Sequence, residues 1–405
     1  MAYGNLVVLM LVDVGNMREA HETFKRLILP DVLSLNSLII GYVIHGEPHQ
    51  ALEMYQNMHE ALHLTGHAYV ALLQACTKMK NSNRGIEIHL DTSKKGILER
   101  NIFIGNSLVD MYAKCGFLRE AQKVFDHISV RDVVLWTALI SGYAHLGEGE
   151  AALTCFGKMQ HEGFSPDVVT IICVLKACAS IAAIEKGKAI HAQIDREGLV
   201  EREILIGNAL VDLYAKCGAP QKAHEVFDKL IVQDEVSWTA LIAGYARHGR
   251  DEIVMDLFDK MVEEGLEPNH ITYTIVLNVC SHSGLLEKGQ MYFEKMSIDH
   301  GIVATPEHYT CMVDLFGRAG LFENVMAIIS KMHVYDHFPV WASLLGSCKK
   351  WGNVELAGLA FKHMIRLDKK CEAAYICMIN IYVASNMQKE AKKIEAMRLE
   401  QKFPK

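Results

Sequence analysis

This sequence lacks the features that mark membrane proteins, secreted proteins and the common nucleotide-dependent enzymes. The longest unbroken apolar run near the start, Leu6 to Val12, is far too short to span a lipid bilayer. The residues after Met1 show neither a signal peptide nor an Arg-rich transit pattern. Neither of the two common glycine-rich phosphate-binding motifs, G-x-x-x-x-G-K-[ST] and G-x-G-x-x-G, occurs. We therefore expect no membrane association, no cofactor and no small-molecule substrate.

The cysteine spacing excludes a zinc-dependent deaminase site within the sequence. Such a site needs an H-x-E motif followed by a C-x-x-C pair, which together hold zinc and activate water. Here Cys173 and Cys178 are five residues apart, and Cys371 and Cys377 are six apart. We expect no catalytic residue in this chain.

One short motif resembles a zinc-protease site and is interpreted as a chance match. Residues 59–63 read His-Glu-Ala-Leu-His, which fits the H-E-x-x-H pattern. The third ligand of the extended pattern would fall on Tyr69, which is not a metal ligand of this kind. Related segments also place Gly163 and Gly265 where this one has Leu62, so a helix should end there. We predict no metal site.

The overall charge is mildly acidic, and half of the residues are hydrophobic. The formal net charge of −7 argues against binding a polyanion through bulk charge, although it leaves room for a local basic groove. A hydrophobic content of 50% allows a continuous apolar core.

A long unit recurs along the chain. Residues 104–116 read Ile-Gly-Asn-Ser-Leu-Val-Asp-Met-Tyr-Ala-Lys-Cys-Gly, and residues 206–218 repeat them almost unchanged, 102 residues later. The same interval relates Trp136 to Trp238, and Cys76 to Cys178 and Cys280. Self-similarity at a fixed interval is typical of a solenoid. Because most cysteines occupy equivalent apolar positions in this pattern, we expect buried, reduced thiols.

Each unit divides into three helical hairpins of 35, 36 and 31 residues. In the hairpin 133–167, Leu139, Ile140 and Tyr143 form an apolar helical stripe. Gly147 should end the first helix of this hairpin, and Gly163 the second. The predicted fold is therefore all-α, a right-handed α-solenoid superhelix of helix-turn-helix hairpins. The predicted hairpins are 1–31, 32–65, 66–101, 102–132, 133–167, 168–203, 204–234, 235–269, 270–305 and 306–337, and two further hairpins of different character follow in 338–405.

These hairpins resemble the pentatricopeptide repeat proteins, in particular the plant subgroup that alternates standard, long and short repeats. Asn-Ala-Leu-Val-Asp-Leu-Tyr-Ala-Lys-Cys-Gly at 208–218 is typical of its short repeats, and Trp-Thr-Ala-Leu-Ile-Ala-Gly-Tyr-Ala at 238–246 resembles its standard repeats. Residues 306–320 and 340–348 resemble the last short repeat and the E extension that follows it. Relatives carry an organelle transit peptide and more repeats before this point. The resemblance therefore implies an incomplete chain from a mitochondrial or chloroplast protein.

The resemblance also implies single-stranded RNA as the ligand, with one base bound per repeat. In this family the fifth and the last residue of a repeat read the base. The corresponding pairs are Asn5 with Asp31, Asn36 with Thr65, Asn106 with Asp132, Thr137 with Asp167, Asn208 with Asp234, and Thr239 with Asn269. Apolar side chains at the second position could clamp base faces, contributing ~1–3 kcal/mol per base. They are Phe103, Val134, Leu205 and Val236.

The chemistry of each pair predicts a base. A carboxylate at the last position only accepts hydrogen bonds and favours guanine or uracil, whose rings carry an N–H. Asn at that position can donate to adenine or cytosine. Thr at the fifth position leaves room for a purine, whereas Asn reaches a smaller pyrimidine. Read against RNA from 5′ to 3′, the pairs predict U-Y-x-U-G-x-U-A, where Y is a pyrimidine and x is not read.

Helix capping is the alternative explanation for these residue types. Asn, Thr and Asp are among the best N-cap residues, and both positions lie near helix starts. Capping alone does not explain why short repeats carry Asn where standard repeats carry Thr. Nor does it explain Val70 and Ile172 at the fifth position of the long repeats. Those long repeats would act as spacers or as docking surfaces for a partner protein.

The resemblance implies a specificity factor for C-to-U editing of organellar RNA, and no enzymatic activity in the chain itself. The partners would be a DYW-type deaminase acting in trans, recruited through the extension 338–405, and organellar editing cofactor proteins. One alternative is a factor for RNA splicing, stability or translation, although relatives in those roles usually lack the extension. Another alternative is a protein-docking solenoid of the tetratricopeptide type that binds no RNA.

Overall fold

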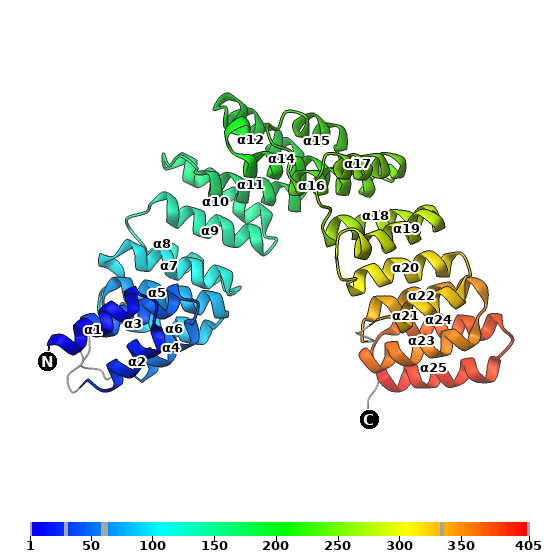
Figure 1. Ribbon diagram of the computed structural model, residues 1–405, viewed down its shortest axis with the longest axis horizontal. Coiled ribbons are helices and arrows are strands. Elements are labelled where there is room, and N and C mark those ends of the chain that lie inside the picture. Colours follow the sequence, from blue (N-terminus) through cyan, green and yellow to red (C-terminus); the bar gives the residue numbers. More distant parts are fainter. Residues whose placement is uncertain (1, 28–30, 58–63, 333–335, 403–405) are drawn as a thin grey trace. The chain divides into compact units, whose positions relative to one another are not determined.

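The computed structural model describes residues 2–27, 31–57, 64–332 and 336–402 (Figure 1). All regular structure in these ranges is helical, which confirms the prediction of an all-α repeat solenoid. The H-E-x-x-H motif at residues 59–63 lies outside them. The chain divides into two compact units, Met1–Leu213 and Tyr214–Lys405, and each is described by itself.

The first unit contains six full hairpins and the start of another. Its helices are α1 (Ala2–Asp13), α2 (Met17–Lys25), α3 (Val32–Ile44), α4 (Pro48–Gln56), α5 (Gly66–Met79), α6 (Ser82–Lys94), η1 (Leu98–Arg100), α7 (Ile102–Lys114), α8 (Leu118–His127), α9 (Val133–His145), α10 (Gly149–His161), α11 (Val168–Ser180), α12 (Ile184–Arg196), α13 (Leu199–Arg202) and most of α14 (Ile204–Lys216).

The second unit continues the same pattern to the end of the described chain. Its helices are α15 (Pro220–Phe227), α16 (Glu235–Arg247), α17 (Asp251–Glu263), α18 (His270–Ser283), α19 (Leu286–Ile298), α20 (Pro306–Arg318), α21 (Phe322–Ser330), α22 (Phe338–Trp351), α23 (Val354–Leu367), α24 (Glu372–Ala384) and α25 (Gln388–Lys402).

The first helices of successive hairpins form one row in each unit. Helices α1, α3, α5, α7, α9 and α11 pack in sequence in the first unit, and α16, α18, α20, α22 and α24 do so in the second. Small residues bring neighbouring helices of this row close together. A Cβ atom on Gly142 would lie 2.4 Å from the Cβ of Ala113, so only glycine fits. One repeat interval later, a Cβ on Gly244 would lie 2.7 Å from the Cβ of Ala215.

The core is apolar and aromatic, as the stripe in the sequence predicts. Leu139 and Ile140 are completely buried. Trp136 is buried edge-on against Phe125 with ring centroids 4.5 Å apart, and Trp238 packs in the same way against Phe227 at 4.8 Å. The expected helix ends are also present, because α9 ends at His145 and α10 at His161. Each end is followed by a glycine with positive φ, Gly147 (+81°) and Gly163 (+85°).

Just over half of the cysteines are buried, in agreement with the expectation from their apolar positions. All eleven are free thiols, and six of them are buried. Burial raises the pKa of both Cys155 and Cys280 to about 11, so these thiols stay protonated and unreactive near neutral pH.

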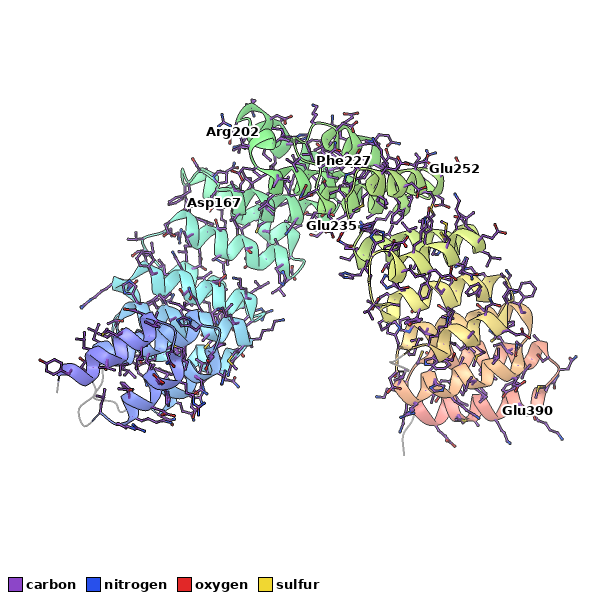
Figure 2. The ribbon with its side chains drawn as sticks, viewed as in Figure 1. Asp167, Arg202, Phe227, Glu235, Glu252 and Glu390 are labelled. Atoms are coloured by element: carbon purple, nitrogen blue, oxygen red, sulfur yellow. The ribbon has the colours of Figure 1, made fainter. Side chains whose placement is uncertain are left out.

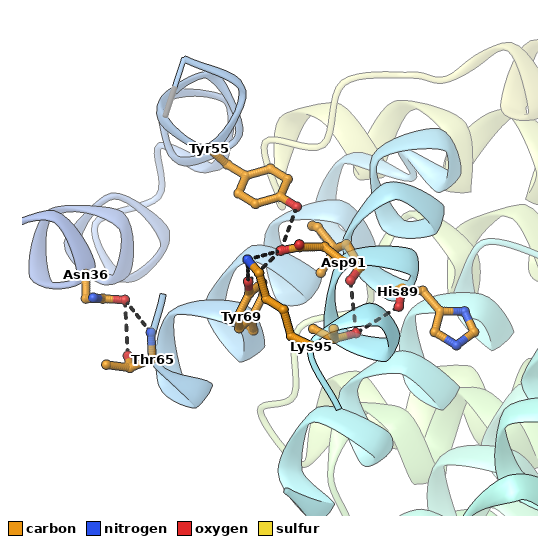
Figure 3. A network of polar contacts seen from close by, with 9 residues as sticks. Asn36, Tyr55, Thr65, Tyr69, His89, Asp91 and Lys95 are labelled. Atoms are coloured by element: carbon orange, nitrogen blue, oxygen red, sulfur yellow. Dashed lines mark hydrogen bonds and ion pairs between the residues drawn. The ribbon is translucent and has the colours of Figure 1, made fainter. Parts of the chain in front are cut away.

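A polar network joins the hairpins 32–65 and 66–101 (Figure 3). The Asp91 carboxylate accepts hydrogen bonds from the Tyr69 hydroxyl at 2.5 Å, the Lys95 ammonium at 2.9 Å and the Tyr55 hydroxyl at 3.4 Å. Burial and the adjacent carboxylate raise the pKa of both tyrosines. Buried hydroxyls are costly unless they are hydrogen-bonded, so this network stabilises the packing of α4, α5 and α6.

The C-terminal hairpins continue the stack although their sequence differs. The Trp351 indole Nε1 of α22 donates to the Gly317 carbonyl of α20 at 3.1 Å, and Lys350 donates to the Arg318 carbonyl at 3.0 Å. A Cβ on Gly317 would lie 2.3 Å from Ser347 Oγ, so α20 and α22 are in close contact. Residues 338–367 therefore pack in the second unit in the same way as one more hairpin.

The described residues contain neither a membrane-spanning helix nor a metal-binding cluster. None of the helices in them is long and apolar enough to cross a bilayer. No group of three or more His, Cys, Asp and Glu side chains in the same ranges could hold a metal ion.

Candidate nucleic-acid interface

The last residue of each predicted pair is the N-cap of the first helix in the following hairpin. The side chains of Asp31, Thr65, Asp132, Asp167, Asp234 and Asn269 accept backbone N–H groups at the starts of α3, α5, α9, α11, α16 and α18. Asp167 (Figure 2) is typical, with Oδ1 2.7 Å from the Thr170 nitrogen. Capping therefore explains the residue type at all six positions. The capping hydrogen bond uses Oδ1 of Asp167, so Oδ2 can accept a hydrogen bond from another donor.

The asparagines at the fifth position contact their partners directly. The Asn36 oxygen Oδ1 accepts from the Thr65 backbone nitrogen at 2.9 Å and from its hydroxyl at 3.1 Å (Figure 3). The Asn5 oxygen accepts from the Asp31 nitrogen at 3.3 Å. Sequence reasoning predicted these pairs, and the structure places the two residues of each pair next to one another.

Asn106 is turned the other way. Its Nδ2 donates to both carboxylate oxygens of Asp132, at 3.2 and 3.1 Å. Its buried Oδ1 has no hydrogen-bond partner among the described residues. A buried acceptor without a partner is uncommon in native proteins and calls for an explanation, such as a ligand that supplies the donor.

The threonines at the fifth position reach their partners through a third side chain. Thr137 Oγ1 lies 2.6 Å from Thr170 Oγ1, which donates to Asp167 Oδ1 at 2.7 Å. Likewise Thr239 Oγ1 lies 2.8 Å from Thr272 Oγ1, which donates to Asn269 Oδ1 at 3.1 Å. Sequence reasoning missed these intermediate threonines, because they belong to the following hairpin.

Several of these side chains line one groove of about 370 Å³ across α5, α7, α9 and α11. Asn106, Thr137 and Asp167 contribute polar atoms, and Val134 and Val169 contribute apolar surface. The two valines are 57% and 54% exposed. Lys114 also lines the groove, and its ammonium lies 2.8 Å from the Asp110 carboxylate. The groove thus combines hydrogen-bonding groups with exposed apolar faces, a combination suited to a flat heterocycle.

Comparison with known proteins identifies the repeat. The model described as "PPR repeat family" matches residues 131–180 and 233–282, and the model described as "PPR repeat" matches 33–61, 106–133, 208–234, 271–299 and 307–336. Together these matches cover more than half of the chain. The chain belongs to the pentatricopeptide repeat proteins.

Curated pentatricopeptide repeat proteins match almost the whole chain. The chloroplastic protein CRR2 of Arabidopsis thaliana is 36% identical over 395 residues, which are 96% of this chain and 60% of CRR2. A putative mitochondrial pentatricopeptide repeat-containing protein of the same plant is 34% identical, covering 98% of this chain and 64% of that protein. The chain therefore spans less than two thirds of the length of either relative.

Solved structures of the same repeat share the fold. The crystal structure of the pentatricopeptide repeat protein PPR10 in complex with an 18-nt psaJ RNA element has a TM-score of 0.76 at 18% identity, covering 98% of this chain and 60% of that one. The structure of PPR10 from maize has a TM-score of 0.56 at the same identity, covering 96% and 62%. At this identity the likeness concerns the fold.

The second positions of these pentatricopeptide repeats form a larger apolar set than sequence reasoning predicted. Phe103, Val134, Leu205 and Val236 are between 57% and 66% exposed. Leu33, Val169 and Ile271 occupy the same position in their hairpins and are at least half exposed. Exposed apolar side chains therefore recur at this one repeat position. The missed residues could have been found by applying the second-position rule to every hairpin.

The remaining predicted pair falls on the division between the two units. Asn208 lies in the first unit and is 6% exposed on α14. Asp234 lies in the second unit and caps α16 through the Ser237 nitrogen at 2.9 Å.

Proposed function

We propose that this pentatricopeptide repeat protein binds single-stranded RNA in a sequence-specific manner, with one base read by each pair of fifth and last residues. The observation that carries the proposal is the shared groove of Asn106, Thr137 and Asp167 with Val134 and Val169. An unpaired base needs hydrogen bonds at its edge and apolar contact on its faces, and this groove offers both. The N-cap contacts support the proposal, because they hold the last-position side chains in fixed orientations.

The relatives point to the same ligand and to an organelle. PPR10 has been crystallised with an RNA element, and two of the curated relatives are named chloroplastic and mitochondrial. We therefore place the RNA target of this protein in one of these organelles.

The finer proposal is that the bound RNA is a C-to-U editing substrate. We propose that a partner of the DYW type supplies the deaminase that acts on this RNA; such a deaminase holds its zinc through a C-x-x-C pair. The hairpins α22 to α25 stack on the repeats and offer a surface to such a partner or to editing cofactor proteins.

The RNA proposal predicts a strong preference for single strands. A 12-nucleotide RNA containing U-Y-x-U-G-x-U-A should bind the purified protein at least tenfold more tightly than the same sequence in a duplex. A duplex would first have to open, at ~1.4 kcal/mol per base-pair step. Fluorescence anisotropy with labelled RNA measures both affinities. Equal affinity for the two forms would contradict the reading of unpaired bases, and no RNA binding at all would favour the protein-docking alternative.

The editing proposal predicts a defect at particular cytidines. In a plant lacking this protein, transcript sequencing should show unconverted cytidines at one or a few organellar sites, and the full-length gene should restore conversion. Purified protein alone should leave cytidine in the target RNA unchanged, because it holds no deaminase motif. If conversion stays complete while splicing or transcript abundance changes, the protein is instead a splicing or stability factor.

A further inference from the structure

A hydroxyl at the third position of the following hairpin stands between the two residues of a predicted pair. Thr170 and Thr272 are completely buried, and both occupy this position. Thr170 contacts Thr137 on one side and Asp167 on the other, at 2.6 and 2.7 Å. Thr272 makes the equivalent contacts with Thr239 and Asn269, at 2.8 and 3.1 Å.

The hydrogen positions in this arrangement follow from the chemistry of its ends. A carboxylate oxygen and an amide oxygen can only accept, so Thr170 and Thr272 must donate their single hydroxyl hydrogen to Asp167 and Asn269. The contacts with Thr137 and Thr239 then require the hydrogens of those two residues. Each fifth-position hydroxyl is therefore left with lone pairs alone, and it can act toward a base only as an acceptor.

A hairpin without this hydroxyl shows a different arrangement. After Asn106, the third position of the following hairpin is Leu135, which has no polar side-chain atom. Asn106 then donates directly to the Asp132 carboxylate. The relay is therefore found where Thr170 or Thr272 follows a fifth-position threonine, and a direct contact is found where Leu135 follows Asn106.

We infer that Thr170 and Thr272 are positioning residues that determine which base the pairs Thr137/Asp167 and Thr239/Asn269 prefer. This inference rests on the proposed RNA-binding function. With Thr137 as an acceptor and Asp167 Oδ2 as a second acceptor, the pair matches guanine, which carries two adjacent donors, N1–H and N2–H. With Thr239 as an acceptor and Asn269 Nδ2 as a donor, the second pair matches adenine, which offers N6–H beside the acceptor N1.

The decisive experiment removes the relay hydroxyl without changing the volume of the side chain. In Thr170→Val, Asp167 still caps α11 through the backbone nitrogen, but the Thr137 hydroxyl hydrogen is released and can be donated to a base. The ratio of affinities for guanine over adenine at the fifth base of U-Y-x-U-G-x-U-A should fall roughly fivefold, the usual effect of one hydrogen bond. Thr170→Ser keeps the hydroxyl and should keep the wild-type ratio.

Two valine variants and a control distinguish a change in base preference from a folding defect. Thr272→Val should change the preference at the eighth base only, and Thr170→Val at the fifth base only, because separate repeats act nearly independently. A folding defect would instead weaken binding to all RNAs equally. Thr154→Val, at an exposed threonine that bonds only its own helix, is the matched control and should change neither ratio.

Three results would count against the inference. If Thr170→Val keeps the wild-type ratio, the relay has no role in base choice. If the guanine-over-adenine affinity ratio at the fifth base falls as far in Thr170→Ser as in Thr170→Val, side-chain volume and not the hydroxyl is responsible. A wild-type protein that binds none of the RNAs with guanine or adenine at the fifth or eighth base would overturn the proposed function, and the relay with it.

Discussion

Replacing Trp136 with alanine is expected to cost about 3–5 kcal/mol of stability, the usual range for a buried tryptophan. The indole is 1% exposed, and its ring meets Phe125 edge-on at 4.5 Å. The guanidinium of Arg131 lies 4.7 Å from the Phe125 ring and 5.8 Å from the Trp136 ring. Removing the indole would leave a cavity where α8 meets α9, and the aromatic contact between these two helices would be lost.

Hydrogen–deuterium exchange measures this effect locally. In a solenoid each hairpin contacts mainly its neighbours, so the loss should be greatest in peptides from α7 to α11. Exchange through local opening should accelerate there by about a hundredfold or more, since each 1.4 kcal/mol corresponds to a factor of ten. Peptides from α20 to α25, in the other unit, should exchange as in the wild type.

Two variants control for the size and the polarity of the removed group. Trp136→Phe keeps an aromatic ring and removes an indole Nε1 that has no hydrogen-bond partner among the described residues. It should cost far less than Trp136→Ala. Trp351→Ala removes a tryptophan that is 51% exposed, and it should also have a smaller effect. If Trp136→Ala proved as mild as Trp351→Ala, the Trp136–Phe125 contact would not hold this part of the stack together.

Much of the fold could be predicted because the sequence repeats. The recurrence of Trp136 at Trp238 indicated equivalent core positions, and both indoles are buried against a phenylalanine. Gly147 and Gly163 indicated helix ends, because glycine readily adopts the left-handed conformation found at both. Local signals of this kind depend on a few neighbouring residues, and the sequence displays them directly.

Contacts between hairpins were harder to predict. Thr137 and Asp167 belong to one hairpin and form a predicted pair, whereas Thr170 lies at the start of the next hairpin, outside that pair. The motifs of residues 338–405 differ from those of the repeats. Yet α22 packs on α20 through Trp351 and Ser347, since shape and not motif decides that contact.

At the last position of each repeat, the residue type alone does not distinguish capping from base reading. Asp167 caps α11 through Oδ1, and the same side chain has a second oxygen. Capping and base reading therefore require the same residue types at the same position, and only an experiment with RNA separates them.

Exchanging the last-position residues of two hairpins should exchange the bases they prefer. In Asp167→Asn, the side-chain oxygen can still cap α11, while an amide replaces Oδ2 and turns an acceptor into a donor. In Asn269→Asp, a donor becomes an acceptor. The expected preferences are adenine in place of guanine at the fifth base, and guanine in place of adenine at the eighth. Asp and Asn are comparably good N-caps, so folding should be unaffected.

Asp167 and Asn269 have different neighbours, so the variants at the two positions need different designs. Asn269 Nδ2 donates to the Glu235 carboxylate, so Asn269→Asp would place two carboxylates side by side. This variant should therefore be made together with Glu235→Gln, with Glu235→Gln alone as its control. The position equivalent to Glu235 beside Asp167 is Val133, which carries no charge, so Asp167→Asn needs no compensation.

The measurement is a binding series of RNAs that differ only at the fifth or the eighth base, with wild type and variants side by side. A mismatch that leaves a buried polar edge unpaired costs ~1–3 kcal/mol, roughly a five- to hundredfold change in affinity. Each variant should invert the order of guanine and adenine at its own base and keep the wild-type order at the other, because the two sites lie in separate repeats. An unchanged order at both bases, in variants that still bind RNA and fold normally, would show that Asp167 and Asn269 serve as helix caps alone.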